Sequence, residues 1–355
     1  MSSEIHDLIE GPITCHCWNS DRTKLALSPN NNLVHIYSKS GGRWQLETVL
    51  KEHDQRVMGM DWAPKSNRLV TCGADRNGYV WTKEGGEWKP VLVVLRIQRA
   101  ATCVKWSPLE NKFAVGSGAR SISICHFEVE HNWWVSKHIK KPIRSTVLSL
   151  DWHPNNCLIA CGCADFKTRV FSAYVKDCDE KPESTCWGKK MTMGNLMAEF
   201  SSPGVGSGGW VHGVSFSPSG NKLAWVSHDS LVCVINQETG KSSFEKTKEL
   251  PYLDCRFVSE TNLIVAGHGC FPAMYKHDND NVSFSNKLDQ QGGKKDTGGL
   301  KAMDKFKRLD KQASAATETT LSTTHQNGIT QISVFKEGGS IATTGVDGKL
   351  VIWKV

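Results

Sequence analysis

Tryptophan recurs along this chain at a nearly constant distance. Trp18, Trp62, Trp106 and Trp152 follow one another at intervals of about 45 residues, a period typical of repeat folds. Each one ends a short segment of alternating character, namely ITCHCW, VMGMDW, ATCVKW and VLSLDW. In repeat folds one copy cannot bury its apolar face alone, and neighbouring copies stack to form a continuous core. A repeat architecture is therefore predicted.

The same template continues with phenylalanine in place of tryptophan. It finds VHGVSF at Phe216, YLDCRF at Phe257 and TQISVF at Phe335, which brings the number of copies to seven. A second marker follows the first at a nearly constant spacing in each copy, at Tyr37, Trp81, Cys125, Phe171, Ile235, Tyr275 and Trp353. Turn residues separate two strands between the markers, and segments such as RWQLETVL supply a fourth. These observations predict an all-β fold, a seven-bladed β-propeller that occupies residues 1–355 as a single domain.

The chain ends and two long connections complete the predicted domain organisation. The seventh copy ends at its third strand with LVIWKV, so we expect the N-terminal strand SEIHDLI to close blade 7. Trp152 and Phe216 are farther apart than the period requires, which predicts a flexible, glycine-rich insert at 176–209 between blades 4 and 5. The excess between Phe257 and Phe335 is larger still and predicts a protruding insert at 290–326 between blades 6 and 7.

Polar residues recur with one spacing in two of the copies. The second and seventh copies place four residues each at the positions of the WD-repeat tetrad: His53, Thr71, Asp75 and Trp81, and His325, Thr343, Asp347 and Trp353. Such a network satisfies buried polar groups and holds the strands of a blade together. Histidine, aspartate and a hydroxyl also occur together in hydrolases, but an active site does not repeat in two blades. We therefore interpret both sets as structural tetrads.

The second insert contains the most distinctive segment of the chain. Four apolar residues recur every three positions and predict a helix near 299–311 with a narrow apolar stripe, formed by Leu300, Met303, Phe306 and Leu309. Basic residues that include Lys305, Lys307 and Arg308 surround the stripe, and 294–311 carries +4 of the formal net charge of +7. Two interpretations stay open. Either the stripe packs back on the propeller, or the helix docks into a groove of an acidic partner.

Composition narrows the classes of function. The 355 residues include no apolar run long enough to cross a membrane, and MSSEIHDLIE is no secretory signal, so we expect a cytoplasmic protein without a membrane partner. The thirteen cysteines are expected to be free thiols, and the closely spaced CHC and CGC pairs lie on strands rather than on the loops typical of zinc sites. A net charge of +7 does not by itself indicate a nucleic-acid partner. The sequence predicts no cofactor, no metal and no enzyme activity.

Two other features are candidates for contacts with partners. Lys140, Lys141 and Arg144 form a basic cluster on the connection into the fourth blade, which is either a solvated rim or a contact for an acidic partner subunit. Trp133 and Trp134 are adjacent and therefore face opposite ways on a strand. One of them is either exposed at an interface or covered by a neighbouring loop.

These motifs together resemble one family more specifically than WD repeats in general. The segments PITCHCWNSDRTKLALSPNNNLVHIY, LKEHDQRVMGMDWAPKSNRLVTCGADRNGYVW, GWVHGVSFSPSGNKLAWVSHDS and AGHGCFP are similar to the WD40-repeat subunit of the actin-related protein two/three complex. The resemblance covers nearly every blade, and a long insert between the sixth and seventh blades is a feature of that family. It departs at the C-terminus, because this chain ends two residues after Trp353 whereas family members continue.

The resemblance implies a non-catalytic scaffold subunit of the complex that forms branched actin filaments. In the family, the propeller packs against other subunits of the complex, and the insert projects toward the actin filament and nucleation-promoting factors. Carried over to this chain, the residues that bind actin or a nucleation-promoting factor are Leu300, Met303, Lys305, Phe306, Lys307, Arg308 and Leu309. The alternative function is a WD40 adaptor that recognises peptides on the top face of the propeller. Such adaptors commonly carry a recruitment domain, for which the seven blades leave no residues.

Overall fold

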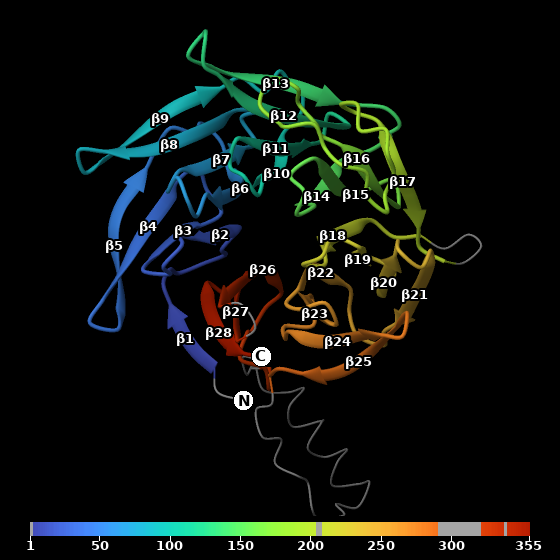
Figure 1. Cartoon of the computed structure of the whole chain (residues 1–355). Helices are drawn as coiled ribbons and strands as arrows, with labels where there is room; N and C mark the ends of the chain where they lie inside the picture. The colour runs from blue at the N-terminus through green and yellow to red at the C-terminus, as the bar shows by residue number, and fades with distance from the viewer. Residues whose placement is uncertain (1–2, 204–207, 290–320, 337–338) are drawn as a thin grey trace, which may run out of the picture.

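Seven four-stranded antiparallel sheets surround a central axis in the computed structural model, which describes residues 3–203, 208–289, 321–336 and 339–355 (Figure 1). The regular elements among these residues are 28 β-strands. The predicted fold class, an all-β seven-bladed β-propeller, is confirmed. No helix in the described part of the chain has the length and apolar character that a membrane crossing requires.

The strands follow the chain from blade to blade. Blades 1 to 3 consist of β2 (Cys15–Trp18), β3 (Lys24–Ser28), β4 (Val34–Ser40) and β5 (Arg43–Leu50); β6 (Val57–Trp62), β7 (Leu69–Gly73), β8 (Gly78–Glu84) and β9 (Glu87–Val93); and β10 (Ala101–Trp106), β11 (Lys112–Ser117), β12 (Ser121–Glu128) and β13 (Trp133–Ile139). Blades 4 to 6 consist of β14 (Val147–Trp152), β15 (Leu158–Cys163), β16 (Lys167–Ser172) and β17 (Leu196–Ser201); β18 (Val211–Phe216), β19 (Lys222–Ser227), β20 (Leu231–Asn236) and β21 (Lys241–Lys246); and β22 (Tyr252–Phe257), β23 (Asn262–Gly267), β24 (Ala273–Asp278) and β25 (Asn281–Lys287). Blade 7 consists of β26 (Ile329–Lys336), β27 (Ser340–Gly345), β28 (Lys349–Lys354) and β1 (Ser3–Asp7).

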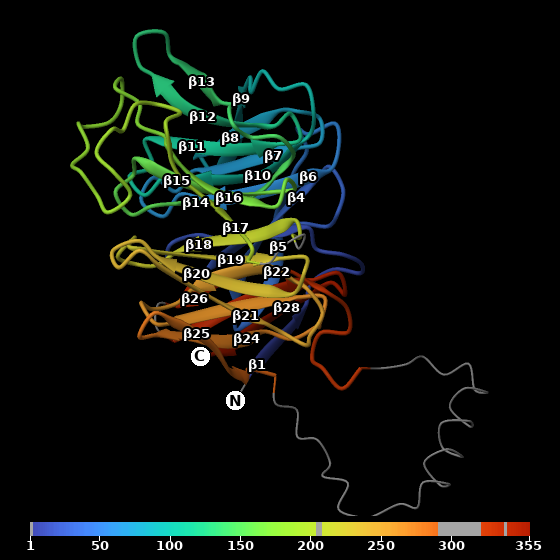
Figure 2. The ribbon, with the colours of Figure 1, turned by 90° about the vertical axis from the view of Figure 1, so that its right-hand side faces the viewer.

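The N-terminal strand supplies the outer strand of the last blade. β1 pairs antiparallel with β28 in a register that places Ser3 opposite Trp353 and Asp7 opposite Lys349. Figure 1 and Figure 2 show the two strands side by side near the labelled chain ends. Since β1 belongs to blade 7 and the chain continues directly into blade 1, this hydrogen-bonded pairing fastens the start of the chain to its last blade and closes the ring. It also covers an edge of β28 that would otherwise be free to pair with another chain.

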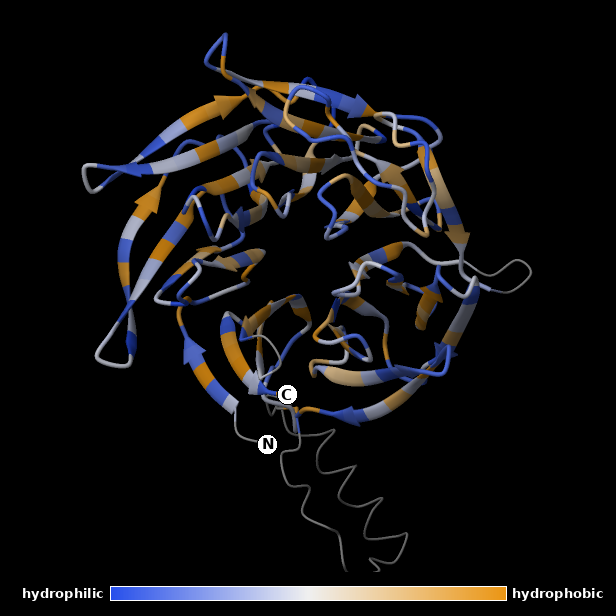
Figure 3. Ribbon diagram, viewed as in Figure 1, coloured by the Kyte–Doolittle hydropathy of each residue, from blue (hydrophilic) through white to orange (hydrophobic). Residues whose placement is uncertain are grey.

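Burial distinguishes the inner strands from the outer ones. Every residue of β11, β15 and β20 is buried, because these strands are covered on both faces by the neighbouring blades. Outer strands such as β5 and β21 instead consist mostly of exposed and partly buried residues. Figure 3 shows apolar bands on the inner strands and a mixture of polar and apolar bands on the outer ones. The seven apolar clusters of the core therefore lie between adjacent sheets rather than at one centre.

Tryptophan pairs strengthen the first three blades. In each, a tryptophan near the tip of the outer hairpin packs on the tryptophan that ends the inner strand. The ring centroids are 5.3 Å apart for Trp18 and Trp44, 5.5 Å for Trp62 and Trp88, and 5.9 Å for Trp106 and Trp134. These contacts bury large apolar surface and explain part of the high tryptophan content.

Part of the segment 176–209, which was expected to be a flexible insert, is a strand of blade 4. β17 lies inside it and pairs with β16 as the outer strand of blade 4. Trp187 is buried, and its indole N–H donates to the Gly220 carbonyl at 2.8 Å. Phe200 stacks on Trp225 with centroids 5.8 Å apart. The glycines and prolines of this segment obscured an apolar strand that the fourth blade requires, and residues 204–207 lie outside the described part.

Hydrogen bonds join neighbouring blades close to the axis. Carboxylates accept from the inner strand of the next blade, with Trp106 N–H donating to Asp61 at 2.8 Å and Phe216 N–H to Asp151 at 2.7 Å. Ile332 N–H donates to Asp254 at 2.9 Å. At the other four junctions the donors and acceptors are of other kinds. Phe257 N–H donates to Ser215 Oγ, and His16 N–H donates to Gln331 Oε1. Trp152 Nε1–H donates to the Lys105 carbonyl, and Val57 N–H donates to the Asn31 carbonyl. Each junction of the ring is thus closed by at least one such bond.

The junction between blades 7 and 1 is bonded most densely around His16. This side chain is fully buried, with Nδ1 2.8 Å from Thr344 Oγ1 and Nε2 2.6 Å from Ser333 Oγ. The indole of Trp18 donates to the same Ser333 hydroxyl at 3.0 Å. Burial, with a smaller contribution from the charge of Lys105, lowers the pKa of His16 to about 3. His16 is therefore neutral at the junction on which ring closure depends.

Deleting residues 2–9 should destabilise the propeller. The change removes β1 and exposes the edge of β28, so we expect a lower Tm and a loss of unfolding free energy on the order of 3 kcal/mol, together with aggregation. Thermal unfolding followed by circular dichroism measures the effect. Ile5→Ser, a change at an exposed position of the same strand, serves as the control. An unchanged melting curve for the deletion would show that another segment closes the ring.

The junction at His16 should make stability sensitive to acid. Because folding lowers the pKa from 6.5 to about 3, the unfolded chain binds a proton between these values that the folded chain does not. The contribution of neutral His16 to the free energy of unfolding is complete above pH 6.5 and is lost as the pH falls below this value. Replacing His16→Gln should therefore flatten the slope of unfolding free energy against pH by up to about 1.4 kcal/mol per pH unit in this range. Equal slopes in denaturant titrations of both proteins would contradict the assignment.

Candidate functional site

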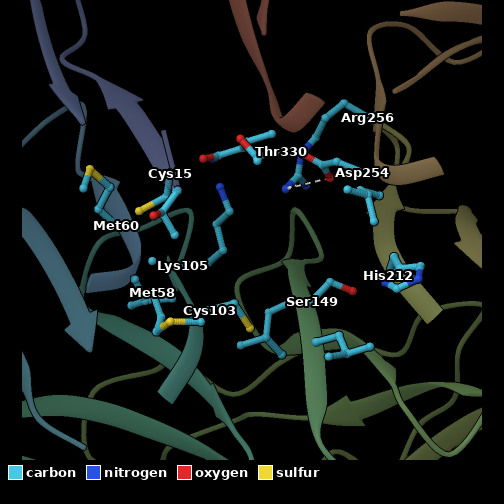
Figure 4. A pocket seen from close by; sticks show the side chains of 17 residues that line it. Cys15, Met58, Met60, Cys103, Lys105, Ser149, His212, Asp254, Arg256 and Thr330 are labelled. Atoms are coloured by element: carbon cyan, nitrogen blue, oxygen red, sulfur yellow. Dashed lines mark ion pairs between the residues drawn. The ribbon is translucent and has the colours of Figure 1, made fainter. Parts of the chain in front are cut away.

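A central hollow of about 150 Å³ is lined by residues from the inner strands of all seven blades. Figure 4 shows Cys15, Met60, Cys103, Ser149, His212 and Asp254 around it, with Lys105 extending inward. The hollow follows from the topology, because the first strand of each blade lies nearest the axis. Alternate residues of these strands face the axis, and the motifs that end in an aromatic residue place charged groups there.

Ion pairs neutralise most of the charge in the hollow. Arg256 lies 3.2 Å from Asp151 and 3.8 Å from Asp254, and Lys105 lies 3.7 Å from Asp61. Burial opposes the charge of Arg256, but Asp254 and Asp151 outweigh it and raise the pKa of the guanidinium. Burial raises the pKa of Asp151, whereas Arg256 and the Phe216 amide favour its ionised form. These groups are already paired with one another and with the backbone.

The thiols at the hollow are not poised for chemistry. Burial raises the pKa of Cys15 to about 12 and that of Cys103 to about 11. Both are therefore protonated at neutral pH and are poor nucleophiles. Among residues 3–203, 208–289, 321–336 and 339–355, no group of three or more histidine, cysteine or acidic side chains could hold a metal ion. The arrangement fits a structural core of the ring.

The structure brings each sequence-predicted tetrad together. In blade 2, His53 Nδ1 is 2.7 Å from Asp75 and Nε2 is 2.9 Å from Thr71 Oγ1, which also accepts from Trp81 Nε1 at 3.0 Å. In blade 7 the corresponding distances among His325, Asp347, Thr343 and Trp353 are 3.0, 2.8 and 2.8 Å. If each imidazole donates from Nδ1, the hydrogen bonds run in one direction from the indole to the carboxylate. The groups hold two strands, the turn between them and the loop that enters the blade together.

The carboxylates of the tetrads have additional partners. Asp75 accepts from the backbone amides of Asp54 and Asn77, both at 3.1 Å. Burial opposes ionisation of Asp75, but the hydrogen bond and electrostatic attraction of His53, together with the backbone hydrogen bonds from Asn77 and Asp54, outweigh it and lower the pKa. Gly73 lies two residues before Asp75. A larger residue would not fit there, because a Cβ on Gly73 would lie 2.6 Å from the Asp75 carboxylate. The histidine, threonine and tryptophan of both tetrads are buried, as hydrogen-bonded groups inside a blade are expected to be.

Blade 4 replaces the tetrad with an ion-pair network. Asp165 occupies the tight turn of this blade but lies 2.9 Å from Arg169, whose Nε is 2.7 Å from Glu199. The network links the turn to the outer strand β17, which carries Glu199. The sequence feature that could have indicated this network is an arginine four positions after the aspartate of the tight turn.

The basic cluster lies on the exposed connection into blade 4. The side chains of Lys140, Lys141 and Arg144 are exposed. Arg144 shares a surface hollow between blades 3 and 4 with Arg99 and Arg120, which the sequence analysis missed because they belong to different loops. Hydroxyl side chains such as Thr146 complete its lining, and no acidic residue lines it among the described residues. The charged side chains that line this hollow are therefore all basic.

The predicted insert helix near 299–311 lies outside the described residues. This holds for all seven residues predicted to bind actin or a nucleation-promoting factor, namely Leu300, Met303, Lys305, Phe306, Lys307, Arg308 and Leu309. The two strands that flank the insert, β25 and β26, lie in adjacent blades. The insert therefore leaves and re-enters the propeller at the junction of blades 6 and 7.

Comparison with known protein families identifies the repeat. A model described as WD domain, G-beta repeat, matches residues 44–82, 136–172 and 317–354. The first and last matches contain the two complete tetrads, and the second contains the ion-pair network of blade 4 in part.

Several curated proteins are similar to the chain over nearly its whole length. Actin-related protein 2/3 complex subunit 1A-A of Xenopus laevis is 58% identical over 98% of this chain and 95% of its own length. Actin-related protein 2/3 complex subunit 1 of Schizosaccharomyces pombe is 40% identical, with 99% of each chain covered. Subunit 1B of the same complex from Arabidopsis thaliana is 41% identical over 99% of this chain and 96% of its own length.

Removing a tetrad carboxylate should destabilise the blade that contains it. Asp75→Ala and Asp347→Ala should each lower the free energy of unfolding by about 1–3 kcal/mol, because buried donors lose their acceptor. Denaturant unfolding measures this loss, and Glu183→Ala at an exposed carboxylate is the control. Trp81→Phe added to Asp75→Ala should cost less than the sum of the two single changes. Full additivity in this cycle would contradict a shared network.

Proposed function

This chain belongs to the family of subunit 1 of the actin-related protein 2/3 complex, and we propose that it is a non-catalytic scaffold subunit of that actin-nucleating complex. The observation that carries the proposal is the 58% identity that extends over 98% of the chain to a protein with that name. The aligned region covers 98% of this chain, so the similarity is not confined to one or two blades.

The construction of the ring supports a scaffold role. Charged side chains near the axis form ion pairs, and hydrogen bonds close all seven junctions between blades. A ring of this kind holds its surface loops in fixed positions, so binding orders few additional residues. Rigid presentation of several surfaces is what a subunit that contacts several neighbours requires.

The insert is the part that we assign to actin or to a nucleation-promoting factor. Its basic side chains include Lys305, Lys307 and Arg308, and an apolar stripe that includes Phe306 lies among them in the sequence. Actin filaments are acidic, so a cationic segment is steered toward them. The strands that flank the insert, β25 and β26, belong to adjacent blades, so the insert occupies one connection of the ring and the other blades can bind the rest of the complex.

The exposed basic cluster is assigned to an acidic surface of another subunit. Lys140 and Lys141 precede Arg144 on one connection, and Arg144 shares its hollow with two further arginines, so positive charge gathers at one side of blades 3 and 4. Rim charges of this kind increase the rate of association and select the partner more than they increase affinity.

Replacing 303–309 with a Gly/Ser linker tests the assignment of the insert. We expect the variant to fold and to co-purify with the other subunits in stoichiometric amount, whereas branch nucleation in pyrene-actin assays and filament co-sedimentation should fall. The control replaces Glu183 and Ser184, which are exposed on another connection, with glycine. Normal branching by the linker variant would mean that the segment has no such role.

Variants of the charged and of the apolar residues of the insert should lose filament binding with a different dependence on salt concentration. Changing Lys305, Lys307 and Arg308 to Glu should weaken filament binding most at low salt, where exposed charges are screened least. Phe306→Ala should weaken it at all salt concentrations, because its contribution is buried apolar area. Identical salt dependence for both variants in co-sedimentation would contradict this division of roles.

A further inference from the structure

The hairpin formed by β12 and β13 ends in apolar side chains that the propeller does not cover. Val129 is 82% exposed and Trp133 is 47% exposed. Figure 1 and Figure 2 both show this hairpin at the rim, with its turn projecting beyond the neighbouring blades. Exposed tryptophan is a common anchor of protein interfaces, since it offers a large apolar area with few rotatable bonds.

The hairpins of blades 1 and 2 show what the fold itself requires at this position. Their strands are similar in length, and their tips are Gly41-Gly42 and Gly85-Gly86, with positive φ at every glycine. The residues that flank these turns are polar in both, Ser40 and Arg43 in blade 1 and Glu84 and Glu87 in blade 2. Blade 3 has four residues in the turn instead of two, and Trp133 at the flanking position.

Neither apolar residue is needed to hold the blade 3 hairpin in place. Trp134 performs that task, because it is 4% exposed and packs on Trp106, Phe113 and Phe127 with centroids 5.1–5.9 Å away. The two strands pair without a register shift from Ile122–Ile139 to Glu128–Trp133. The tip therefore projects from a well-anchored ribbon, so an ordered partner surface can bind it at low entropic cost.

The charge of the tip indicates the chemistry of the partner. Glu128 and Glu130 accompany the apolar residues, and no lysine or arginine occurs between Arg120 and Lys137. This negative segment stands out in a chain whose formal net charge is +7. Glu128 is 3.3 Å from His131, whereas Glu130 lies in the outermost turn and is exposed. Complementarity calls for an apolar pocket with a basic rim.

We propose that the tip of the β12–β13 hairpin, with Val129 and Trp133 as its anchors, docks into an apolar pocket rimmed by lysine or arginine on another subunit of the complex. The inference rests on the proposed function, which supplies the partner subunits. It assigns this contact to blade 3, away from the insert between blades 6 and 7.

A tip exchange tests the proposal with the full chain. Replacing 129–132 by Gly-Gly and changing Trp133→Glu reproduces the tip of blade 2, keeps two carboxylates and removes both apolar anchors. Phe244→Ser, at a side chain that is 53% exposed on β21, is the matched control. Both proteins are co-expressed with the remaining subunits, and the dissociation constant of the purified chain for the complex lacking it is measured by titration. We expect unchanged thermal unfolding for both, and affinity weakened about tenfold or more for the tip exchange alone.

Charge is tested separately, and each outcome decides a different point. Changing Glu128 and Glu130 to Lys should weaken binding more at low salt than at high salt.

If the wild-type chain joins the complex and the tip exchange binds as tightly, the proposal is overturned while the scaffold function stands. If the wild-type chain does not join the complex, both are overturned. Sedimentation of the chain alone should show a monomer, and a dimer lost in the tip exchange would replace the partner subunit with a second copy of this chain.

Discussion

The ring depends on contacts that each blade makes with its two neighbours. A single four-stranded sheet would expose two apolar faces and would leave the polar groups of its inner strand to water, whereas stacking removes both costs at once. At the junction between blades 7 and 1, the stacked blades are distant in sequence, since His16 and Gln331 are 315 residues apart. Loop closure at that separation is entropically unfavourable. The hydrogen-bonded pairing of β1 with β28 stabilises the same junction, because β1 continues along the chain into blade 1.

Sequence periodicity was sufficient for the fold because the packing problem is the same in every blade. An aromatic residue recurs at or next to the end of the inner strand in every blade, so its period was visible without knowledge of the contacts. The tetrads were visible for the same reason. β17 was missed because its apolar residues Leu196 and Phe200 lie beside proline and glycine, which dominated the interpretation. The Arg256–Asp151 pair spans 105 residues and joins non-adjacent blades, and no local pattern indicates such a contact. The tryptophan pairs did carry a signal, because their two members are separated by a similar stretch of chain in each of the first three blades.

The interior has properties that favour structure over chemistry. A central hollow lined by cysteine, histidine, aspartate and lysine has the composition of an active site, but its charges are paired and its thiols are protonated. The same distinction applies to the tetrads, where a histidine between an aspartate and a threonine is shielded from substrate and the threonine is bonded to a tryptophan. Residue type alone therefore predicts little, and the partners of each group decide what it can do.

In a repeated architecture, the sister blades indicate which residues the fold requires. Trp44, Trp88 and Trp134 occur in three hairpins and pack on the inner tryptophan in each, so their role is structural. Val129 and Trp133 have no counterpart in the two glycine tips and are exposed, so packing does not account for them. The insert between blades 6 and 7 also has no counterpart in most other connections. Because the ring tolerates change at these positions, selection for binding can act on them without loss of stability, and interaction surfaces of a propeller subunit are expected where its repeats differ.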